Sequence, residues 1–302
     1  MEKEFKTYKE QIKLLKSKGL AVPDEEHAIK VLRSTSYFAL INGYKRPFKD
    51  TNGNYLPDAC FDDIENLYVF DEQMRVFVLG QLLALETRIK SSISYTFSQR
   101  YREPDSYLNV NNYNYTGNKT QAVNKLVSIL QSIYDSNEHR YITHYKKNHK
   151  GEVPLWVLIN AMTFGQISKM YSLLKEGEQQ RIGGDFGVSS QKDMMSILDI
   201  LTLYRNVCAH NERLYDFKTK HQIGRKYIEK YVGSDTGHEP DYDNIGKHLF
   251  GALAVCAYLA DDKKILDEFR KLMKNAVIMQ NPNLKAHIIK NTELPAGWLD
   301  QE

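Results

Sequence analysis

The stretch Ile64–Tyr101, IENLYVFDEQMRVFVLGQLLALETRIKSSISYTFSQRY, decides the fold class of this chain. Its large apolar side chains recur every three or four positions, at Met74, Phe77, Val78, Leu82, Leu85, Ile89, Ile93 and Phe97. Such spacing places them in one stripe along an α-helix, whose period is about 3.6 residues. The pattern predicts one long helix, or two collinear helices if Gly80 introduces a kink.

Helical patterns continue on both sides of this stretch. Three short helices are expected before it, running from Tyr8 to Gly19, from Asp24-Glu25-Glu26 onward, and over residues 36–42 before Gly43. Acidic residues in the first turn of the second helix suit the positive end of the helix dipole. Later helices are expected at about 120–137, from Pro154, from Ser189 or Ser190, at 242–260 and at 261–279. No strand series or internal repeat is visible, so the predicted fold class is all-α.

Two further features concern the organisation of the chain. Residues 181–188 contain Gly183-Gly184 but lack the lysine and spacing of a phosphate-binding P-loop, so they are expected to be a connector. We divide the chain into an N-terminal helical region (1–50), a helical core (58–285) and a C-terminal tail (286–302). The N-terminal three-helix region is open to two interpretations, a DNA-reading helix-turn-helix or a cap packed on a larger domain.

Composition narrows the class of protein. Hydrophobic residues make up 42% and charged residues 26%, which is ordinary for a globular protein. A net charge of +3 does not by itself indicate a nucleic-acid-binding protein, so any basic surface must be local. The three cysteines, Cys60, Cys208 and Cys256, are too widely spaced for a zinc knuckle or a disulfide framework. The first residues are charged, and the longest apolar run, Leu249–Ala260, is about half a membrane span. We therefore expect a cytoplasmic protein that does not enter a membrane.

The segment Tyr204–Tyr215, YRNVCAHNERLY, contains the residues most suited to chemistry. Arg205 and His210 are separated by four residues, a spacing that occurs nowhere else in the sequence. Arg205 shares a helical stripe with Leu198 and Leu201, and a guanidinium in such a position needs a carboxylate, a phosphate or an open cleft. Two interpretations remain open here. Arg205 is either a structural residue paired with an acid such as Glu86, or a phosphate-binding residue.

An arginine and a histidine supply half of what RNA cleavage without a metal requires. A histidine with a pKa near neutrality transfers the proton of the ribose 2′-OH, and an arginine stabilises the charge on the phosphate. In an unbroken helix the two side chains would point about 140° apart. Either the helix ends near Cys208 and His210 turns back, or two chains share one site. A dimer would supply two histidines and two arginines.

Residues 205–215 resemble the signature of the Abi-like (AbiD/AbiF-type) abortive-infection family. The resemblance extends over almost the whole chain, in order. It includes Tyr8–Phe48, the polar residues Asp71, Arg75, Glu86 and Arg88, Pro154-Leu155-Trp156 with Phe164-Gly165, and Leu294–Trp298.

The resemblance implies a HEPN-type helical bundle, a homodimer, and a role in phage defence that acts on RNA. The HEPN motif, an arginine followed by a histidine, implies a metal-independent endoribonuclease toxin without a cofactor. Carried onto this chain, Arg205 and His210 form the catalytic pair, and Asn206 supports them. Arg213 would be a second phosphate-binding cation, and Glu86, Tyr204 and Tyr215 are supporting residues. Some HEPN toxins have a tyrosine two residues after the histidine, and this chain has Glu212 there, so control by modification of that tyrosine is not expected.

The segment His139–Lys150 gives an independent indication of RNA contact. It contains cations, histidines and tyrosines without an acid, and cations bind phosphates while aromatic rings stack on unpaired bases. We assign RNA contact to Arg140, Lys146, Lys147 and Lys150, against the alternative of a solvated loop. Its histidines recur every five residues, whereas zinc-binding helices use a spacing of four, so no metal site is expected.

Two other functions remain open from the sequence. One is a non-cleaving HEPN protein that captures a regulatory or antitoxin RNA. The other is a DNA-binding regulator that uses residues 8–48.

Overall fold

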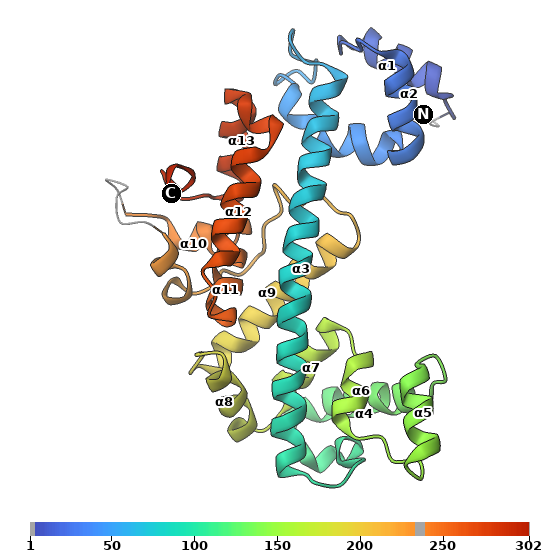
Figure 1. Ribbon diagram of the computed structural model, residues 1–302, viewed down its shortest axis with the longest axis vertical. Coiled ribbons are helices and arrows are strands. Elements are labelled where there is room, and N and C mark those ends of the chain that lie inside the picture. The colour runs from blue at the N-terminus through green and yellow to red at the C-terminus, as the bar shows by residue number, and fades with distance from the viewer. Residues whose placement is uncertain (1–3, 233–238, 302) are drawn as a thin grey trace.

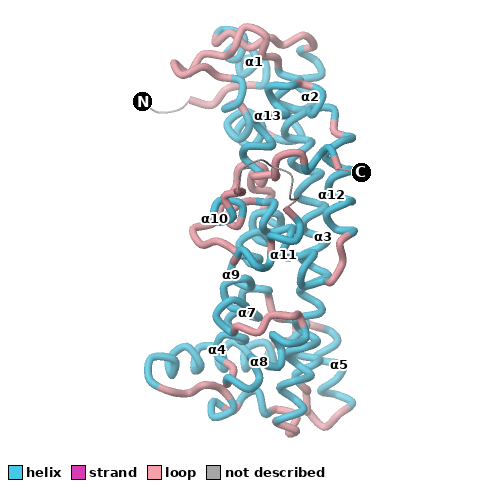
Figure 2. Tube along the Cα trace, turned by 90° about the vertical axis from the view of Figure 1, so that its left-hand side faces the viewer, coloured by secondary structure: helices cyan, strands magenta, loops and turns pink. Residues whose placement is uncertain are grey.

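A computed structural model describes residues 4–232 and 239–301 and consists of helices joined by loops and turns (Figure 1). Helix α3 (Phe61–Arg100) runs along most of the length of an elongated molecule, and the other helices pack around it (Figures 1 and 2). Its apolar stripe is buried from Met74 to Phe97, apart from the partly buried Phe77. The helix continues through Gly80. The prediction of one long helix and the all-α fold class are therefore confirmed.

The N-terminal helices cap one end of α3, at the top of Figure 1. They are α1 (Tyr8–Ser17), α2 (Glu25–Thr35) and the π-helical turn η1 (Phe38–Asn42). Asp24 caps α2 by accepting a hydrogen bond from the backbone N–H of His27. The backbone N–H of Phe61, the first residue of α3, donates to the carbonyl oxygen of Ala21 over 2.9 Å. This hydrogen bond ties the N-terminal region to the start of the long helix.

The opposite end of α3 is surrounded by five helices, coloured green to olive in Figure 1. They are α4 (Thr120–Asp135), α5 (Arg140–Asn148), α6 (Leu155–Leu158), α7 (Phe164–Leu173) and α8 (Glu176–Asp185). The basic segment is thus largely helical.

The connector predicted at 181–188 was wrong for residues 181–185, which form the last turns of α8. The reason lies in Gly183, where a Cβ atom would lie 2.4 Å from the carbonyl oxygen of Val188. The chain turns back tightly here, and the backbone N–H of Val188 donates to the carbonyl oxygen of Gly183 over 2.8 Å. The glycine serves this close approach within a helix and does not mark a loop.

Helix α9 (Gln191–Ala209), capped by Ser190 as predicted, crosses α3 near its middle. The remaining helices lie to the left of α3 in Figure 1. They are α10 (Tyr242–Ile245), α11 (Leu249–Ala260), α12 (Lys264–Asn275) and α13 (Pro282–Thr292). The helix expected over 242–260 is interrupted between α10 and α11. A Cβ atom at Gly251 would lie 2.4 Å from the carbonyl oxygen of Ile245, so the chain doubles back closely there.

The C-terminal residues pack against the core. Trp298 is buried, with its ring 5.3 Å from that of Phe250 and 6.2 Å from that of Phe269. The boundary that we drew at residue 285 falls inside α13. The division of the chain into three parts stays a prediction.

Candidate functional site

The Arg205–His210 segment lies where α9 ends. The last helical residue is Ala209, and His210 is the capping residue, with its backbone N–H donating to the carbonyl oxygen of Asn206 over 2.9 Å. Asn211 follows with a left-handed backbone (φ 54°), and the N–H of Glu212 donates to the carbonyl oxygen of Val207. The helix therefore ends just before the histidine, which agrees with the first part of one sequence-based alternative. That His210 turns back towards Arg205 stays a prediction. Asn206 and His210 are both exposed.

Arg205 stands beside Glu86 of α3, the acid that the sequence suggested, but the contact is loose. The Nε atom of Arg205 lies 3.9 Å from Oε2 of Glu86, which is too long for a hydrogen bond, and both atoms are buried without a hydrogen-bond partner. The other carboxylate oxygen of Glu86 pairs with Lys90 Nζ at 2.7 Å. Within residues 4–232 and 239–301 the Arg205 guanidinium makes no other ion pair or hydrogen bond. Its side chain is 27% exposed, so an anion such as phosphate can reach it from solvent and accept hydrogen bonds from it.

A buried polar network, which we call the Asp71 clamp, holds the chain that follows His210. It consists of Tyr44, Asp71, Arg75 and the backbone of Leu214 and Tyr215. The carboxylate of Asp71 accepts hydrogen bonds from the Tyr44 hydroxyl (2.7 Å), Arg75 Nη1 (2.5 Å), Leu214 N–H (3.0 Å) and Tyr215 N–H (2.7 Å). Asp71 is 0% exposed and Arg75 is 2% exposed.

All four of these neighbours of Asp71 donate hydrogen bonds, which favours an ionised carboxylate. Burial raises the pKa of the Asp71 carboxyl, and the hydrogen bonds from Leu214 and Tyr44 act in the opposite direction. The hydrogen-bonding capacity of Arg75 is less completely used, because its Nε and Nη2 atoms are buried without hydrogen-bond partners. The guanidinium also lies 5.8 Å from the centre of the Tyr68 ring. The clamp fixes the backbone just beyond the exposed histidine, and thereby the direction in which the chain leaves α9.

Arg213 connects the same segment to the N-terminal region. Its Nη1 atom donates to the carbonyl oxygen of Gly43 over 2.5 Å, and its Nε atom donates to Asp216 over 2.6 Å. These contacts compete with the role of a second phosphate-binding cation that we expected for Arg213. The end of the N-terminal region and the segment after His210 therefore share two sets of hydrogen bonds, through Tyr44 and through Gly43.

A family model described as Abi-like protein matches residues 30–216, from within α2 to just beyond Tyr215. The chain belongs to the Abi-like family. This membership indicates a role in abortive infection, a form of defence against phage, and confirms the resemblance inferred from the sequence. No curated protein and no solved structure gives a significant match to the chain.

The two predicted supporting tyrosines of this Abi-like protein lie in its core. The Tyr204 hydroxyl donates to the carbonyl oxygen of Lys247 over 3.2 Å, and its ring packs edge-on against Phe217 at 5.0 Å. Tyr215 is fully buried, and its hydroxyl has no hydrogen-bond partner. Burial raises the pKa of both hydroxyls. Both rings pack the interior behind the site and do not reach its surface.

The basic segment of the Abi-like chain lies apart from Arg205 and His210. Helix α5 is at the lower end of the molecule, whereas α9 ends near its middle (Figures 1 and 2). Lys146 donates to the carbonyl oxygen of Tyr134 and lies 4.1 Å from the centre of its ring, so it has a structural partner. Arg140, Lys147 and Lys150 are exposed. Helix α5 and the end of α9 therefore do not form one site.

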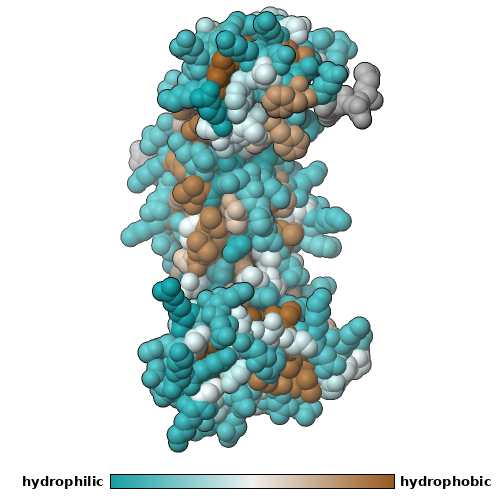
Figure 3. All heavy atoms as spheres, turned by 90° about the vertical axis from the view of Figure 1, so that its right-hand side faces the viewer, coloured by the Kyte–Doolittle hydropathy of each residue, from teal (hydrophilic) through white to brown (hydrophobic). Residues whose placement is uncertain are grey.

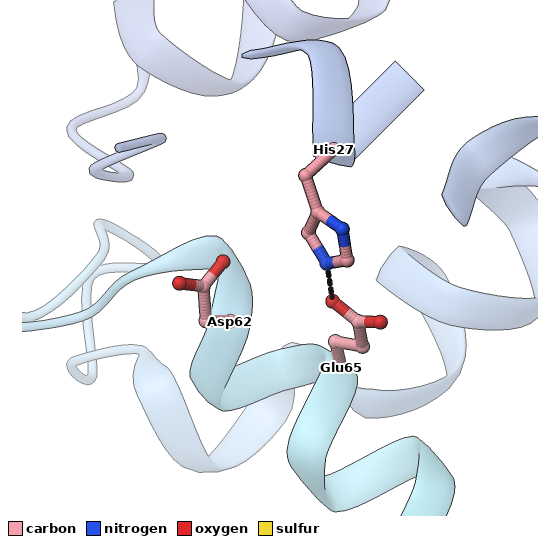
Figure 4. Close-up of side chains that lie close together, drawn as sticks. All are labelled: His27, Asp62 and Glu65. Atoms are coloured by element: carbon pink, nitrogen blue, oxygen red, sulfur yellow. Dashed lines mark hydrogen bonds and ion pairs between the residues drawn. The ribbon is translucent and has the colours of Figure 1, made fainter. Parts of the chain in front are cut away.

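One cluster of possible metal ligands was missed by sequence reasoning. His27 of α2 and Asp62 and Glu65 of α3 place their ligand atoms within 4.8 Å of one another (Figure 4). His27 Nε2 and Glu65 Oε2 are 2.7 Å apart, and this hydrogen bond is the main cause of a raised His27 pKa. Imidazole and carboxylate groups bind divalent transition metals, but the ion pair alone accounts for this contact. No sequence signal joins residues 38 positions apart, and only the packing of α2 on α3 brings them together.

Among the described residues, no helix is both long enough and hydrophobic enough to span a membrane.

Proposed function

We propose that this Abi-like protein is a metal-independent HEPN-type endoribonuclease, in which Arg205 and His210 act on RNA across a homodimer. The observation that carries the proposal is that Arg205, in the last turns of α9, is held only loosely by Glu86, while His210 is exposed where that helix ends. A structural arginine at this place would be expected to form a close ion pair with Glu86, and the separation of 3.9 Å falls short of one.

The chemistry follows from the residues. One histidine removes the proton of a ribose 2′-OH, and the 2′-oxygen attacks the adjacent phosphorus. The bond from phosphorus to the 5′-oxygen breaks, a second histidine protonates that oxygen, and a 2′,3′-cyclic phosphate and a 5′-hydroxyl remain. Arg205 binds the phosphate and stabilises the negative charge that develops on it. In this proposal the amide of Asn206, which is exposed, donates to the same phosphate. One chain supplies a single histidine at this position, so acid and base together require two chains.

Exposed apolar side chains support a second copy. Val69, Val76 and Leu83 follow one another at intervals of seven along α3, which puts them on one side of the helix, and all three are exposed. On α9, exposed Leu203 precedes Asn206 and His210 at a spacing that shares their face. Figure 3 shows hydrophobic surface at mid-height on the side of the molecule that lies at the right in Figure 1. An exposed leucine on the face of α9 that carries Asn206 and His210 favours an interface that includes this face.

A second candidate function is RNA capture without cleavage, and α5 favours it. Exposed Arg140, Lys147 and Lys150 form a cationic surface at a distance from Arg205 and His210. Such a surface binds phosphates whether or not a cleavage site is present.

The test is to induce expression of the natural chain, Arg205→Ala and His210→Ala in bacteria, with and without phage, and to sequence RNA ends that carry a 2′,3′-cyclic phosphate. We expect growth arrest and new ends with the natural chain, and cleavage roughly 100- to 1,000-fold lower in both variants. His221→Ala, which removes an exposed histidine elsewhere, is the matched control and should cleave normally. Intact RNA in all strains, combined with RNA binding that survives His210→Ala, would support the capture function instead.

A further inference from the structure

A groove lies between the second half of α3 and the short helix α6. It encloses about 510 Å³ and is lined by Tyr95, Gln99 and three serines of α3, by Arg102 just beyond that helix, and by Trp156 of α6. None of its described lining residues is acidic. The cluster of side chains lies outside the arginine–histidine site and has no role in the chemistry described above.

The two aromatic rings of this groove are unusually exposed. Tyr95 is 61% exposed and Trp156 is 54% exposed, whereas the other tryptophan of the chain, Trp298, is 1% exposed. Tryptophan is among the side chains that gain most from burial, so an open tryptophan beside an open tyrosine at a groove indicates a surface that something else covers.

The surroundings of the rings favour a nucleic acid over a protein. Arg181 of α8 lies 5.7 Å from the centre of the Tyr95 ring and donates a hydrogen bond to Gln99. Arg102 adds a second cation, while the serines and Gln99 offer hydroxyl and amide groups. The carboxylate of Asp185, an acidic residue of α8, is already engaged, because it accepts a 2.5 Å hydrogen bond from the Ser92 hydroxyl. Aromatic rings with arginines and small polar groups suit unpaired bases and their phosphates, and a described lining without acidic residues favours a polyanion as the ligand.

We propose that this groove, which we call the stacking groove, binds unpaired bases of a single-stranded RNA, with Tyr95 and Trp156 stacking on the bases. The inference rests on the proposed function, because it names the strand that would reach Arg205 and His210. Glu86, which lies beside Arg205, and Tyr95 are nine positions apart on α3, which corresponds to about 14 Å along the helix axis and to opposite faces of the helix. A strand that reaches both sites would therefore pass around α3. Helix α6 and the end of α9 lie on the same side of α3 (Figure 1).

The experiment measures RNA binding in a His210→Ala background, so that the RNA is not cut. A fluorescein-labelled single-stranded RNA of about 12 nucleotides is titrated with this protein and with versions that also carry Trp156→Ala, Tyr95→Ala or Trp156→Phe. We expect Trp156→Ala and Tyr95→Ala to weaken binding about fivefold to a hundredfold, and Trp156→Phe to retain most of it. Phe38→Ala, which removes an exposed aromatic ring of the N-terminal region, is the control and should bind like the parent.

Two further readouts separate stacking from a structural defect. Because Trp298 is buried, RNA should quench the fluorescence of Trp156, and a duplex of the same sequence should quench it much less. Unchanged affinity in both alanine variants, or an equal loss for single strand and duplex, would overturn the proposal. So would a lower molecular mass of Trp156→Ala in light scattering, since the groove would then be an interface between two copies of the chain.

The outcome is separable from that of the nuclease test. If the chain with His210 intact leaves RNA uncut while binding still depends on Trp156, only the nuclease proposal fails. If RNA is cut at an undiminished rate in Trp156→Ala and Tyr95→Ala, only the stacking groove fails.

Discussion

Two acids of the same helix meet the end of α9, and they are engaged differently. Asp71 accepts four hydrogen bonds and is completely enclosed. Glu86 forms one close ion pair with Lys90 at 2.7 Å, and its distance to Arg205 is 3.9 Å. Asp71 fixes the backbone of Leu214 and Tyr215, whereas Glu86 lies beside Arg205 without forming a close ion pair with it. The difference indicates that the backbone after His210 is held rigidly, whereas the Arg205 guanidinium remains available to bind a ligand.

This contrast distinguishes the structural charges of the Asp71 clamp on α3 from the candidate functional charge of Arg205 on α9. A buried charge must be paired, because an unpaired one would cost several kcal/mol. A partly exposed arginine can remain loosely paired, because water solvates it until a phosphate replaces that water.

The largest expected effect is that of Asp71→Ala. Loss of the carboxylate leaves Arg75 buried without a counter-ion and two backbone N–H groups without an acceptor. We expect the free energy of unfolding to fall by about 3–5 kcal/mol, whereas Arg205→Ala should change it by about 1 kcal/mol or less. Urea denaturation of both variants measures the contrast, with exposed Glu72→Ala as the control. Equal small effects at Asp71 and Arg205 would remove the distinction drawn between them.

A pair of tyrosines sharpens the comparison at an intermediate magnitude. The Tyr44 hydroxyl donates to Asp71 and accepts from Arg75, whereas the Tyr215 hydroxyl is buried without a partner. Tyr44→Phe should lower the free energy of unfolding by about 1.5–3 kcal/mol, because its partners are charged. Tyr215→Phe should leave stability unchanged or raise it slightly, because it removes an unsatisfied polar group. Chemical denaturation of the two variants provides the measurement, and a larger loss for Tyr215→Phe would contradict this description of the clamp.

The smallest effect concerns the exposed pair of His27 and Glu65, which also joins the N-terminal region to α3. The hydrogen bond with Glu65 raises the pKa of His27 above its unfolded value. The pair therefore stabilises the fold fully below the unfolded pKa, near 6.5, and this contribution is lost as pH rises through the folded pKa. Because the histidine side chain is 44% exposed, solvent screens the pair, and its contribution should be at most about 0.5 kcal/mol.

The measurement is urea denaturation of the natural chain and His27→Gln at about pH 5.5 and about pH 8.5. The natural chain should exceed His27→Gln in stability at the lower pH, and the two should converge at the higher pH. A difference that grows as pH rises would show that this sign is wrong.

Part of the local geometry around α9 was predictable from the sequence. The N-cap at Ser190 and the position of Glu86 beside Arg205 agree with the expectations. The role of the clamp was not predictable, although a charged pair four residues apart on the buried side of α3 was a signal for it. Tyr204 and Tyr215 were named as supporting residues from the family resemblance, and both rings lie in the core, Tyr204 on the buried side of α9 and Tyr215 beyond its end.

The sequence by itself determined the all-α class, the long helix and the approximate ends of most others, because helices form through contacts between residues three and four positions apart. Only the tertiary structure decided which distant residues meet. Asp71 binds backbone 143 and 144 positions away, and His27 meets Glu65 across 38 positions. Gly183 and Gly251 show the same limit. The sequence suggested a loop at Gly183 and gave no indication for Gly251, whereas each glycine allows a backbone carbonyl of a nearby turn to lie close to its helix. Contacts of this kind depend on how whole helices pack, and no local spacing records that.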